Sequence, residues 1–300
     1  MFHNSLGRWT AVFLLISVLA LVWVAASPSE DAQPRQPVSP VAYPKEGTSD
    51  QTREEPPAQL PDVTEEKSEE EAPVSQPAYD FSRPAPESPA VDNSYFADAA
   101  FVGDSRTDGF LIYSGIGCGK NLTSNGLSIF KLGEKKALTM DGQSYTLLEA
   151  LALEEYGKVY LSLGVNELGY HDDEGFYNSY CQAIDQIRVL QPQAVIYIQG
   201  LIPLNEELIV QTSGRTYLTN EHLRVYNELM KKAAEEKQVV FLDLYPEFAD
   251  ENGQLPAQDS RDGVHLYSGP CKEWLEYLKT HTVDYDTLYP DGAPQTATGE

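Results

Sequence analysis

The sequence is poor in cysteine and in basic residues for a chain of 300 residues. Its three cysteines are widely separated and none lies in a CxxC pair: Cys118, Cys181 and Cys271. A disulfide framework and a cysteine-based zinc site are therefore not expected, and at most one bridge is possible. Lys and Arg number 21 against 46 Asp and Glu, a formal net charge of -25. Because affinity for DNA or RNA depends largely on basic side chains that neutralise phosphates, a nucleic-acid partner is not expected.

An apolar run near the N-terminus, AVFLLISVLALVWVAA, follows a short head that carries Arg8. Its length falls between the apolar part of a signal peptide and the roughly 18 to 20 residues of a membrane-spanning helix. We expect residues 1–26 to be an export segment. It is either a single-pass anchor in the cell membrane with the C-terminal part outside, or a cleaved signal peptide of a secreted protein.

The composition changes twice after this segment. Residues 27–92 hold 13 of the 20 prolines and 15 acidic against 5 basic residues, with almost no apolar periodicity. Such a segment buries too little apolar surface to offset its ordering entropy, so we predict a disordered, extended Pro/Glu-rich linker. Residues 93–286 have the composition of one globular domain, and residues 287–300 form a short polar tail.

Strand and helix patterns alternate within this domain. Four short apolar runs lack the polar alternation of a one-sided sheet, which is typical of parallel strands covered on both faces: Ala100–Val102, Val159–Leu163, Ala194–Ile198 and Val239–Leu244. Helical periodicity lies between and after them, over residues 144–156, 176–190, 219–237 (with Thr219 as N-cap) and 270–280. The alternation predicts an α/β fold with a three-layer, doubly wound, mostly parallel sheet.

Ligands of such sheets bind at the carboxyl ends of the strands, so the residues that follow each run are candidates for a site. Gly103-Asp104-Ser105 follows the first run, where a serine can present both its hydroxyl and its N–H group to a substrate. Gly164-Val165-Asn166 follows the second run, and the amide of Asn166 can donate to a developing oxyanion.

Two further motifs complete the set. Gly126 follows a short run around Lys120 and could supply a backbone N–H. Asp262-Gly263-Val264-His265 precedes the last helix and offers an imidazole base with a carboxylate three residues away. Each motif taken alone is also typical of an ordinary turn or helix cap. Their order along the chain favours a catalytic site.

This order of Ser, Gly, Asn and His resembles the SGNH hydrolase superfamily, also called the GDSL esterase/lipase family, over about residues 93–280. The resemblance implies a flavodoxin-like fold with Ser105 as nucleophile, His265 as general base and Asp262 as the group that orients it. It further implies an oxyanion hole made by the backbone N–H groups of Ser105 and Gly126 and the side chain of Asn166. No cofactor and no metal are predicted.

The sequence departs from this pattern at two positions. Arg106 stands where the family name has Leu, and Glu167 stands where Asp is common. Glu167 keeps the charge one methylene further out, which we expect to alter the support of the loop and to leave Asn166 intact. We also expect residues 129–143 to form a small hairpin or a lid beside the site.

The leading hypothesis is an extracytoplasmic serine esterase that hydrolyses short acyl esters, chiefly acetyl esters, of cell-envelope carbohydrate. Its expected partners are a small acyl ester or acylated carbohydrate, and the membrane through the N-terminal segment. The acidic composition favours neutral over polyanionic substrates. Two alternatives stay open: an O-acyltransferase on the same scaffold and a non-catalytic surface-binding domain.

Overall fold

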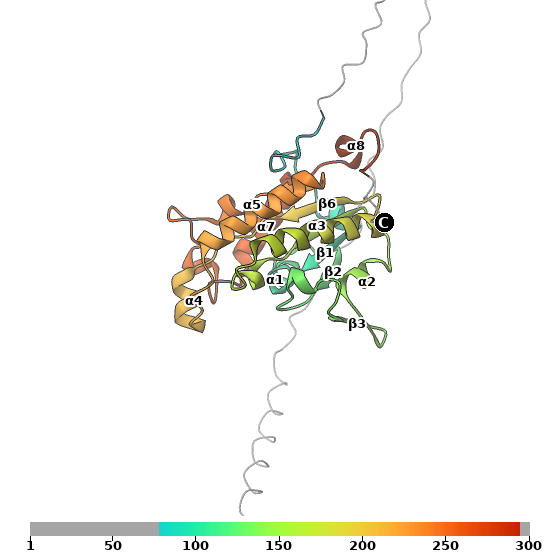
Figure 1. Cartoon of the computed structure of the whole chain (residues 1–300). Coiled ribbons are helices and arrows are strands. Elements are labelled where there is room, and N and C mark those ends of the chain that lie inside the picture. The colour runs from blue at the N-terminus through green and yellow to red at the C-terminus, as the bar shows by residue number, and fades with distance from the viewer. Residues whose placement is uncertain (1–77, 295–300) are drawn as a thin grey trace, which may run out of the picture. The chain divides into compact units, whose positions relative to one another are not determined.

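A five-stranded parallel sheet forms the centre of the protein (Figure 1). We describe it from a computed structural model, in which residues 78–294 are placed. The strands are β1 (Ala99–Gly103), β2 (Lys120–Thr123), β5 (Lys158–Ser162), β6 (Val195–Gln199) and β7 (Val240–Leu242). Their order, β2-β1-β5-β6-β7, is that of flavodoxin-like sheets. The predicted fold class is therefore confirmed.

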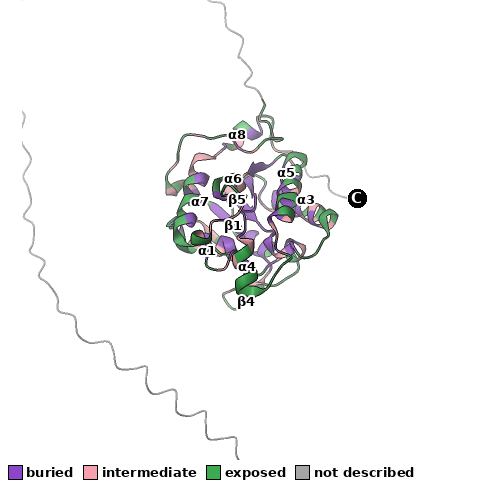
Figure 2. Ribbon diagram, turned by 90° about the vertical axis from the view of Figure 1, so that its left-hand side faces the viewer, coloured by how far each residue is buried: buried purple, intermediate pink, exposed green. Residues whose placement is uncertain are grey.

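Helices cover both faces of the sheet, so every central strand is buried (Figure 2). Successive residues of β1 show the two sides: Ala100 and Val102 belong to one hydrophobic cluster, and Phe101 belongs to the other. The first cluster is closed by α2 (Leu147–Leu151), α3 (Asp173–Leu190) and α5 (Asn220–Glu236). The second is closed by α1 (Ser105–Tyr113), α6 (Tyr245–Phe248) and α7 (Ser268–Thr280). Burial on both faces explains why the strands lack polar alternation.

The remaining elements are short. They are the antiparallel hairpin β3 (Leu138–Met140) and β4 (Gln143–Tyr145), the helices α4 (Glu206–Ser213) and α8 (Tyr285–Leu288), and the 3-10 turns η1 (Asn93–Phe96), η2 (Ile129–Lys131), η3 (Val165–Glu167) and η4 (Ala257–Asp259). The N-terminal end of α5 agrees with prediction, because the side chain of Thr219 accepts from the N–H of His222.

The helix predicted over residues 144–156 is shorter than expected. Gln143–Tyr145 pairs with Leu138–Met140 as a strand instead of starting the helix. A capping box between Thr146 and Glu149 then sets the first turn at Leu147. The predicted start was wrong because strand pairing and a cap, neither of which changes apolar periodicity, decide where this helix begins. The helix also ends earlier than predicted, at Leu151.

The packed part of the chain extends beyond both ends of the predicted domain. Within residues 78–92, which we assigned to the linker, the N–H of Ala85 donates to the Phe241 carbonyl at 2.8 Å and that of Ser88 to Thr280 at 2.6 Å. At the other end Tyr289, assigned to the tail, is buried. The predicted export segment, the rest of the predicted linker and residues 295–300 lie outside the described residues. Within residues 78–294 no helix has both the length and the hydropathy needed to cross a membrane.

Candidate active site

Ser105 is presented by a tight turn between the central strand β1 and helix α1. Asp104 caps the helix, and its carboxylate accepts from the N–H of Arg106 at 2.9 Å. Gly103 is required before it, because a Cβ there would lie 2.2 Å from the Thr107 hydroxyl and 2.9 Å from the Ser162 carbonyl. Ser105 is the first residue of the helix, so its N–H has no hydrogen-bond partner within the helix. The N-terminus of the helix also carries the partial positive charge of the helix dipole.

His265 reaches Ser105 from the loop between η4 and α7. Its Nε2 lies 2.9 Å from the Ser105 hydroxyl, and its Nδ1 lies 2.7 Å from the Asp262 carboxylate. The other oxygen of Asp262 accepts from the backbone N–H groups of Val264 and His265. Gly263 presses against the carbonyl of Asn205, where a Cβ would lie at 2.4 Å, so only glycine fits this turn. The three residues predicted as a triad form one hydrogen-bonded chain.

The pKa values of Asp262, which belongs to this chain, and of Asp104, which lies beside it, are shifted in opposite directions. Burial would raise the pKa of Asp262, but hydrogen bonds from the backbone and ring of His265 outweigh it and hold this pKa below its usual range. Burial of Asp104 is complete and raises its pKa to about 6, although the N–H and the charge of Arg106 act against the shift. Asp262 is thus ionised beside the imidazole at neutral pH, as a group that stabilises an imidazolium must be.

Asn166 lies beside Ser105 and connects the first three motifs. Its Nδ2 donates to the Asp104 carboxylate and to the carbonyl of Leu127, both at 3.0 Å. Gly126 is adjacent to Leu127 and adopts a left-handed φ of 70°. To donate to a substrate oxyanion, Asn166 must exchange one of its two bonds for the ligand.

The two departures from the family pattern are both buried. Glu167 is fully buried, and one carboxylate oxygen accepts from the N–H of Ile129. Burial raises its pKa to about 7, against this hydrogen bond. Glu167 therefore supports the loop, as expected, through its hydrogen bond with the N–H of Ile129. Arg106 donates to the Ile202 carbonyl at 2.9 Å, and burial lowers its pKa to about 10 despite the nearby Asp104.

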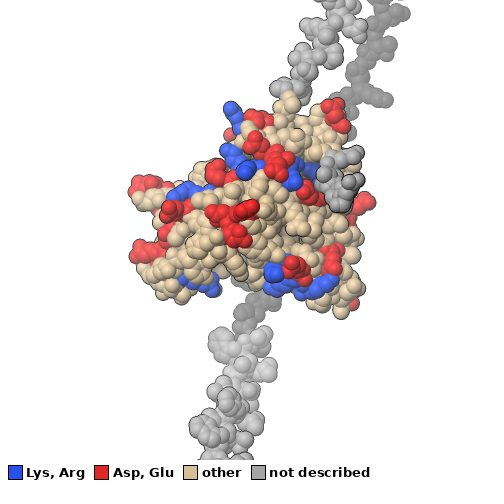
Figure 3. Space-filling view, viewed as in Figure 1, with Lys and Arg blue, Asp and Glu red and all other residues tan. Residues whose placement is uncertain are grey.

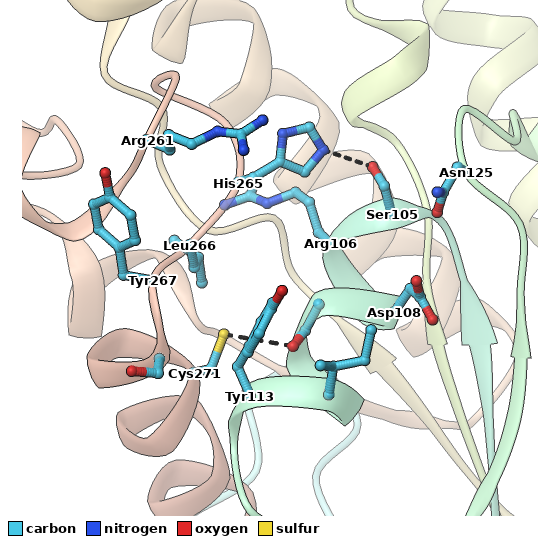
Figure 4. A pocket seen from close by; sticks show the side chains of 13 residues that line it. Ser105, Arg106, Asp108, Tyr113, Asn125, Arg261, His265, Leu266, Tyr267 and Cys271 are labelled. Carbon is cyan, nitrogen blue, oxygen red and sulfur yellow. Dashed lines mark hydrogen bonds between the residues drawn. The ribbon is translucent and has the colours of Figure 1, made fainter. Parts of the chain in front are cut away.

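Two cavities meet at Ser105 and His265, which line both of them. The larger, which we call the α1 cavity, has a volume of about 530 Å³ and lies between α1 and the start of α7 (Figure 4). The smaller, the α4 cavity, has a volume of about 310 Å³ and also contains Asn166 and Asp262. The predicted hairpin exists as β3 and β4, but residues 129–143 line neither cavity and so do not act as a lid there.

Several lining residues were not predicted. In the α1 cavity these are Tyr113 of α1 and, from the loop before α7, Arg261 and Tyr267. In the α4 cavity they are Arg215 and Tyr217, which follow helix α4. Nothing in the local sequence distinguishes these residues from solvated loop residues, apart from the position of Arg261 next to Asp262.

The comparison with known families agrees with this geometry. The model of the GDSL-like Lipase/Acylhydrolase family matches residues 101–268, from β1 to the first turn of α7. The chain belongs to this family. It is a hydrolase of the SGNH type, and the resemblance drawn from the four motifs is confirmed. Among curated proteins none matches the chain.

Comparison with solved structures finds similar chains at low sequence identity. A Streptococcus pneumonia protein provisionally called a platelet activating factor is 23% identical, with a TM-score of 0.50 over 66% of this chain and 85% of that one. A GDSL-like lipase from Bacteroides thetaiotaomicron is 14% identical, with a TM-score of 0.44 over 61% and 90%. A peptidoglycan O-acetylesterase is 19% identical, with a TM-score of 0.42 over 58% and 46%. The first of these likenesses shows a shared fold and nothing more.

Proposed function

We propose that this acylhydrolase is an extracytoplasmic serine esterase that removes short acyl groups, chiefly acetyl, from cell-envelope carbohydrate. The observation that carries the proposal is the hydrogen-bonded chain from the Ser105 hydroxyl through His265 to Asp262, placed at the start of α1. A serine hydroxyl is a weak nucleophile at its own pKa, and an adjacent base oriented by a carboxylate is what activates it.

In the proposed reaction the Ser105 Oγ attacks the ester carbonyl while His265 Nε2 takes the hydroxyl proton. Asp262 stabilises the imidazolium, and the oxyanion is held by the N–H groups of Ser105 and Gly126 and by Asn166. The C–O bond to the sugar then breaks, and His265 gives its proton to the departing sugar oxygen. Water, deprotonated by His265, attacks the acyl-serine and releases the carboxylic acid and free Ser105.

The lining of the α4 cavity supports a short acyl group. This cavity is bordered by Thr212, Ser213 and Arg215, all of them exposed and polar or charged. A long hydrocarbon chain there would leave much of its surface in contact with polar groups or water, which is unfavourable. An acetyl group needs only a small part of this cavity. The α1 cavity is lined mostly by apolar surface, with Arg261 and Asp108 among its polar groups, so its lining does not distinguish acyl lengths.

The extracytoplasmic location in the proposal is inferred from the N-terminal sequence. The apolar run of residues 11–26 and the proline-rich segment after it fit a domain held outside the cell membrane, or one secreted after cleavage. An acylated carbohydrate of the envelope is a substrate such a domain would meet.

The test is a chain-length series with the purified protein. We expect rapid hydrolysis of 4-nitrophenyl acetate, slower hydrolysis of the butyrate and little of the decanoate. Ser105→Ala and His265→Ala should each lower kcat/KM for the acetate by roughly 10⁵- to 10⁶-fold, since the pair acts as a unit. A fluorophosphonate probe should label Ser105 in the wild type and not in His265→Ala.

Other outcomes point to the alternatives. Full activity of Ser105→Ala would refute the triad. Failure of the wild type to react with any ester or with the probe would instead indicate a non-catalytic binding domain. Transfer of the acetyl group to an added sugar, found by mass spectrometry of the products, would indicate an acyltransferase.

A further inference from the structure

The two cavities at Ser105 contain the same kinds of side chain, although they are built from different elements. The α1 cavity contains Arg261 together with Tyr113 and Tyr267, and the α4 cavity contains Arg215 together with Tyr217. In Figure 4, Arg261 and Tyr267 lie on the His265 side of Ser105, in the α1 cavity. Because Ser105 and His265 line both cavities, a substrate that occupies both would meet an arginine and an aromatic ring in each.

Arg215 and Arg261 differ from the other arginines of the described part of the chain in their side-chain contacts. Among the residues described, neither Arg215 nor Arg261 has a side-chain hydrogen bond or an ion pair within the protein. The other four arginines of this part of the chain each have one: Arg83 with Asp80, Arg106 with the Ile202 carbonyl, Arg188 with Tyr289 and Arg224 with Tyr245. The guanidinium donors at the site are thus free for a ligand.

The acidic groups of the same cavities are already engaged. Asp108 in the α1 cavity accepts from the Asn121 amide at 2.9 Å, and Asp262 in the α4 cavity accepts from His265. Their carboxylates are therefore turned to partners in the protein. A guanidinium presents its donors as a planar fork that matches a carboxylate. The guanidinium donors of Arg261 and Arg215, one in each cavity at Ser105, are therefore available to an anionic group of a ligand, although the chain as a whole carries -25.

The exposed tyrosines are concentrated at the same place. In the part of the chain that the structure describes, four tyrosines rank as exposed large side chains, namely Tyr113, Tyr170, Tyr217 and Tyr267. Three of them line the two cavities, and the fourth follows Gly169, against which the ring of Tyr217 packs. Exposed aromatic rings in a cleft mark a binding surface, and their flat apolar faces suit the C–H face of a sugar ring.

We propose that the substrate is an acylated glycan whose sugar units carry carboxylates on both sides of the acylated unit. In this arrangement Arg261 binds one carboxylate and Arg215 another, while Tyr113, Tyr267 and Tyr217 pack on the sugar rings between them. The proposal rests on the esterase function proposed above and names its substrate class. It revises the expectation of a neutral substrate, which followed from net charge alone. Acidic side chains are spread among basic ones over the face in Figure 3, so net charge does not describe the local field at the site.

Binding to the Ser105→Ala full chain tests the proposal without turnover. Two ligands differ only in charge: an acetylated oligogalacturonate and the same oligomer with its carboxylates converted to primary amides. We expect calorimetry to show the acid form bound at least about fivefold more tightly, the size of one or two partly exposed ion pairs. The difference should shrink as sodium chloride is raised from about 0.05 to 0.5 M, because salt screens exposed charges.

Variants assign the effect to the two cavities. Arg215→Gln and Arg261→Gln should each remove part of the preference for the acid form, and the double variant should abolish it. Arg83→Gln, an exposed arginine outside both cavities, is the matched control and should keep the full preference. Tyr217→Ala should weaken the binding of both forms to a similar degree, since a ring face does not distinguish acid from amide.

The outcomes separate this proposal from the esterase function. Equal affinity for the acid and amide forms, together with hydrolysis of 4-nitrophenyl acetate by the wild type, would overturn the substrate class and leave the esterase intact. A clear preference for the acid form in a protein that hydrolyses no ester would overturn the esterase and keep the anionic subsites. Tighter binding of a glycerol phosphate oligomer than of the acid glycan would overturn the choice of carboxylate.

Discussion

The proposed nucleophile, Ser105, and the proposed base, His265, are held in the protein by different means. Ser105 follows a central strand, and its neighbours Asp104 and Arg106 are buried. His265 stands on an exposed loop, with 47% of its side chain accessible, and is held by bonds within residues 260–266 and by the contact of that loop with Asn205. The nucleophile thus depends on the core, and the base depends on a local turn. Substitutions on the two sides should separate loss of stability from loss of activity.

The two regions also differ in how the pKa of their aspartate is shifted. Asp104, at the nucleophile, is fully buried and has its pKa raised to about 6, so its ionised form opposes folding. Asp262, at the base, is partly exposed, and hydrogen bonds from His265 lower its pKa against the effect of burial. The carboxylate with a proposed catalytic role is thus kept ionised by hydrogen bonds, whereas the carboxylate of Asp104 is buried away from water.

Among substitutions that separate the two regions, the largest effect should come from Asp262→Asn, which tests the local turn. We expect kcat for 4-nitrophenyl acetate to fall by about 10⁴-fold. A neutral amide does not stabilise the imidazolium that forms on His265 during the reaction, and it favours the wrong tautomer of the ring. Urea unfolding at neutral pH should lose only the stabilising contribution of the ionised Asp262. The control is Asp259→Asn, three residues upstream and outside both cavities. A loss of less than tenfold would mean that another group orients His265.

A smaller loss is expected for Asn166→Ala, which lies between the two regions. If its amide leaves Asp104 or Leu127 for the oxyanion, kcat should fall by about 10² to 10³ with little change in KM, since the bond forms only in the transition state. The exposed Asn252→Ala serves as control. A rise in KM at constant kcat would show that Asn166 contacts the bound ester and not the oxyanion.

The smallest effect concerns stability and the buried Asp104. Its folded pKa of about 6 exceeds the ordinary aspartate value of 3.8, so between these values the folded state binds more protons than the unfolded state. The free energy of unfolding must then fall as pH rises through this window. Relative to Asp104→Asn, the wild type should lose about 1 to 3 kcal/mol from pH 4 to pH 7 in urea titrations.

The control for this titration is Asp262→Asn, for which the sign is reversed. Because the folded pKa of Asp262 is lowered, its stabilising contribution is present at neutral pH and is lost as pH falls below the unfolded value. Parallel curves for wild type and Asp104→Asn would show that Asp104 does not titrate as its burial requires.

Much of the fold was predictable because the patterns are strong and local. The four apolar runs predicted β1, β5, β6 and β7, since strands buried on both faces need continuous apolar residues. Periodicity could not predict that residues 143–145 pair as a strand, or that residues 78–92 pack on the domain. The first depends on pairing with residues 138–140, and the second depends on a surface formed by distant residues such as Phe241 and Thr280.

Parts of the candidate site were likewise predictable from the sequence, and other parts were not. The sequence alone determined the nucleophile motif, the Asp262-x-x-His265 motif and the family, because these depend on residue type at short spacing and on order along the chain. Only the tertiary structure decided that Asn166 bonds to Asp104, that Arg215 and Arg261 stand on opposite cavities at Ser105, and that their donors are free. The physical reason is that the parallel sheet brings the carboxyl ends of its strands to one edge, where residues far apart in the sequence become neighbours.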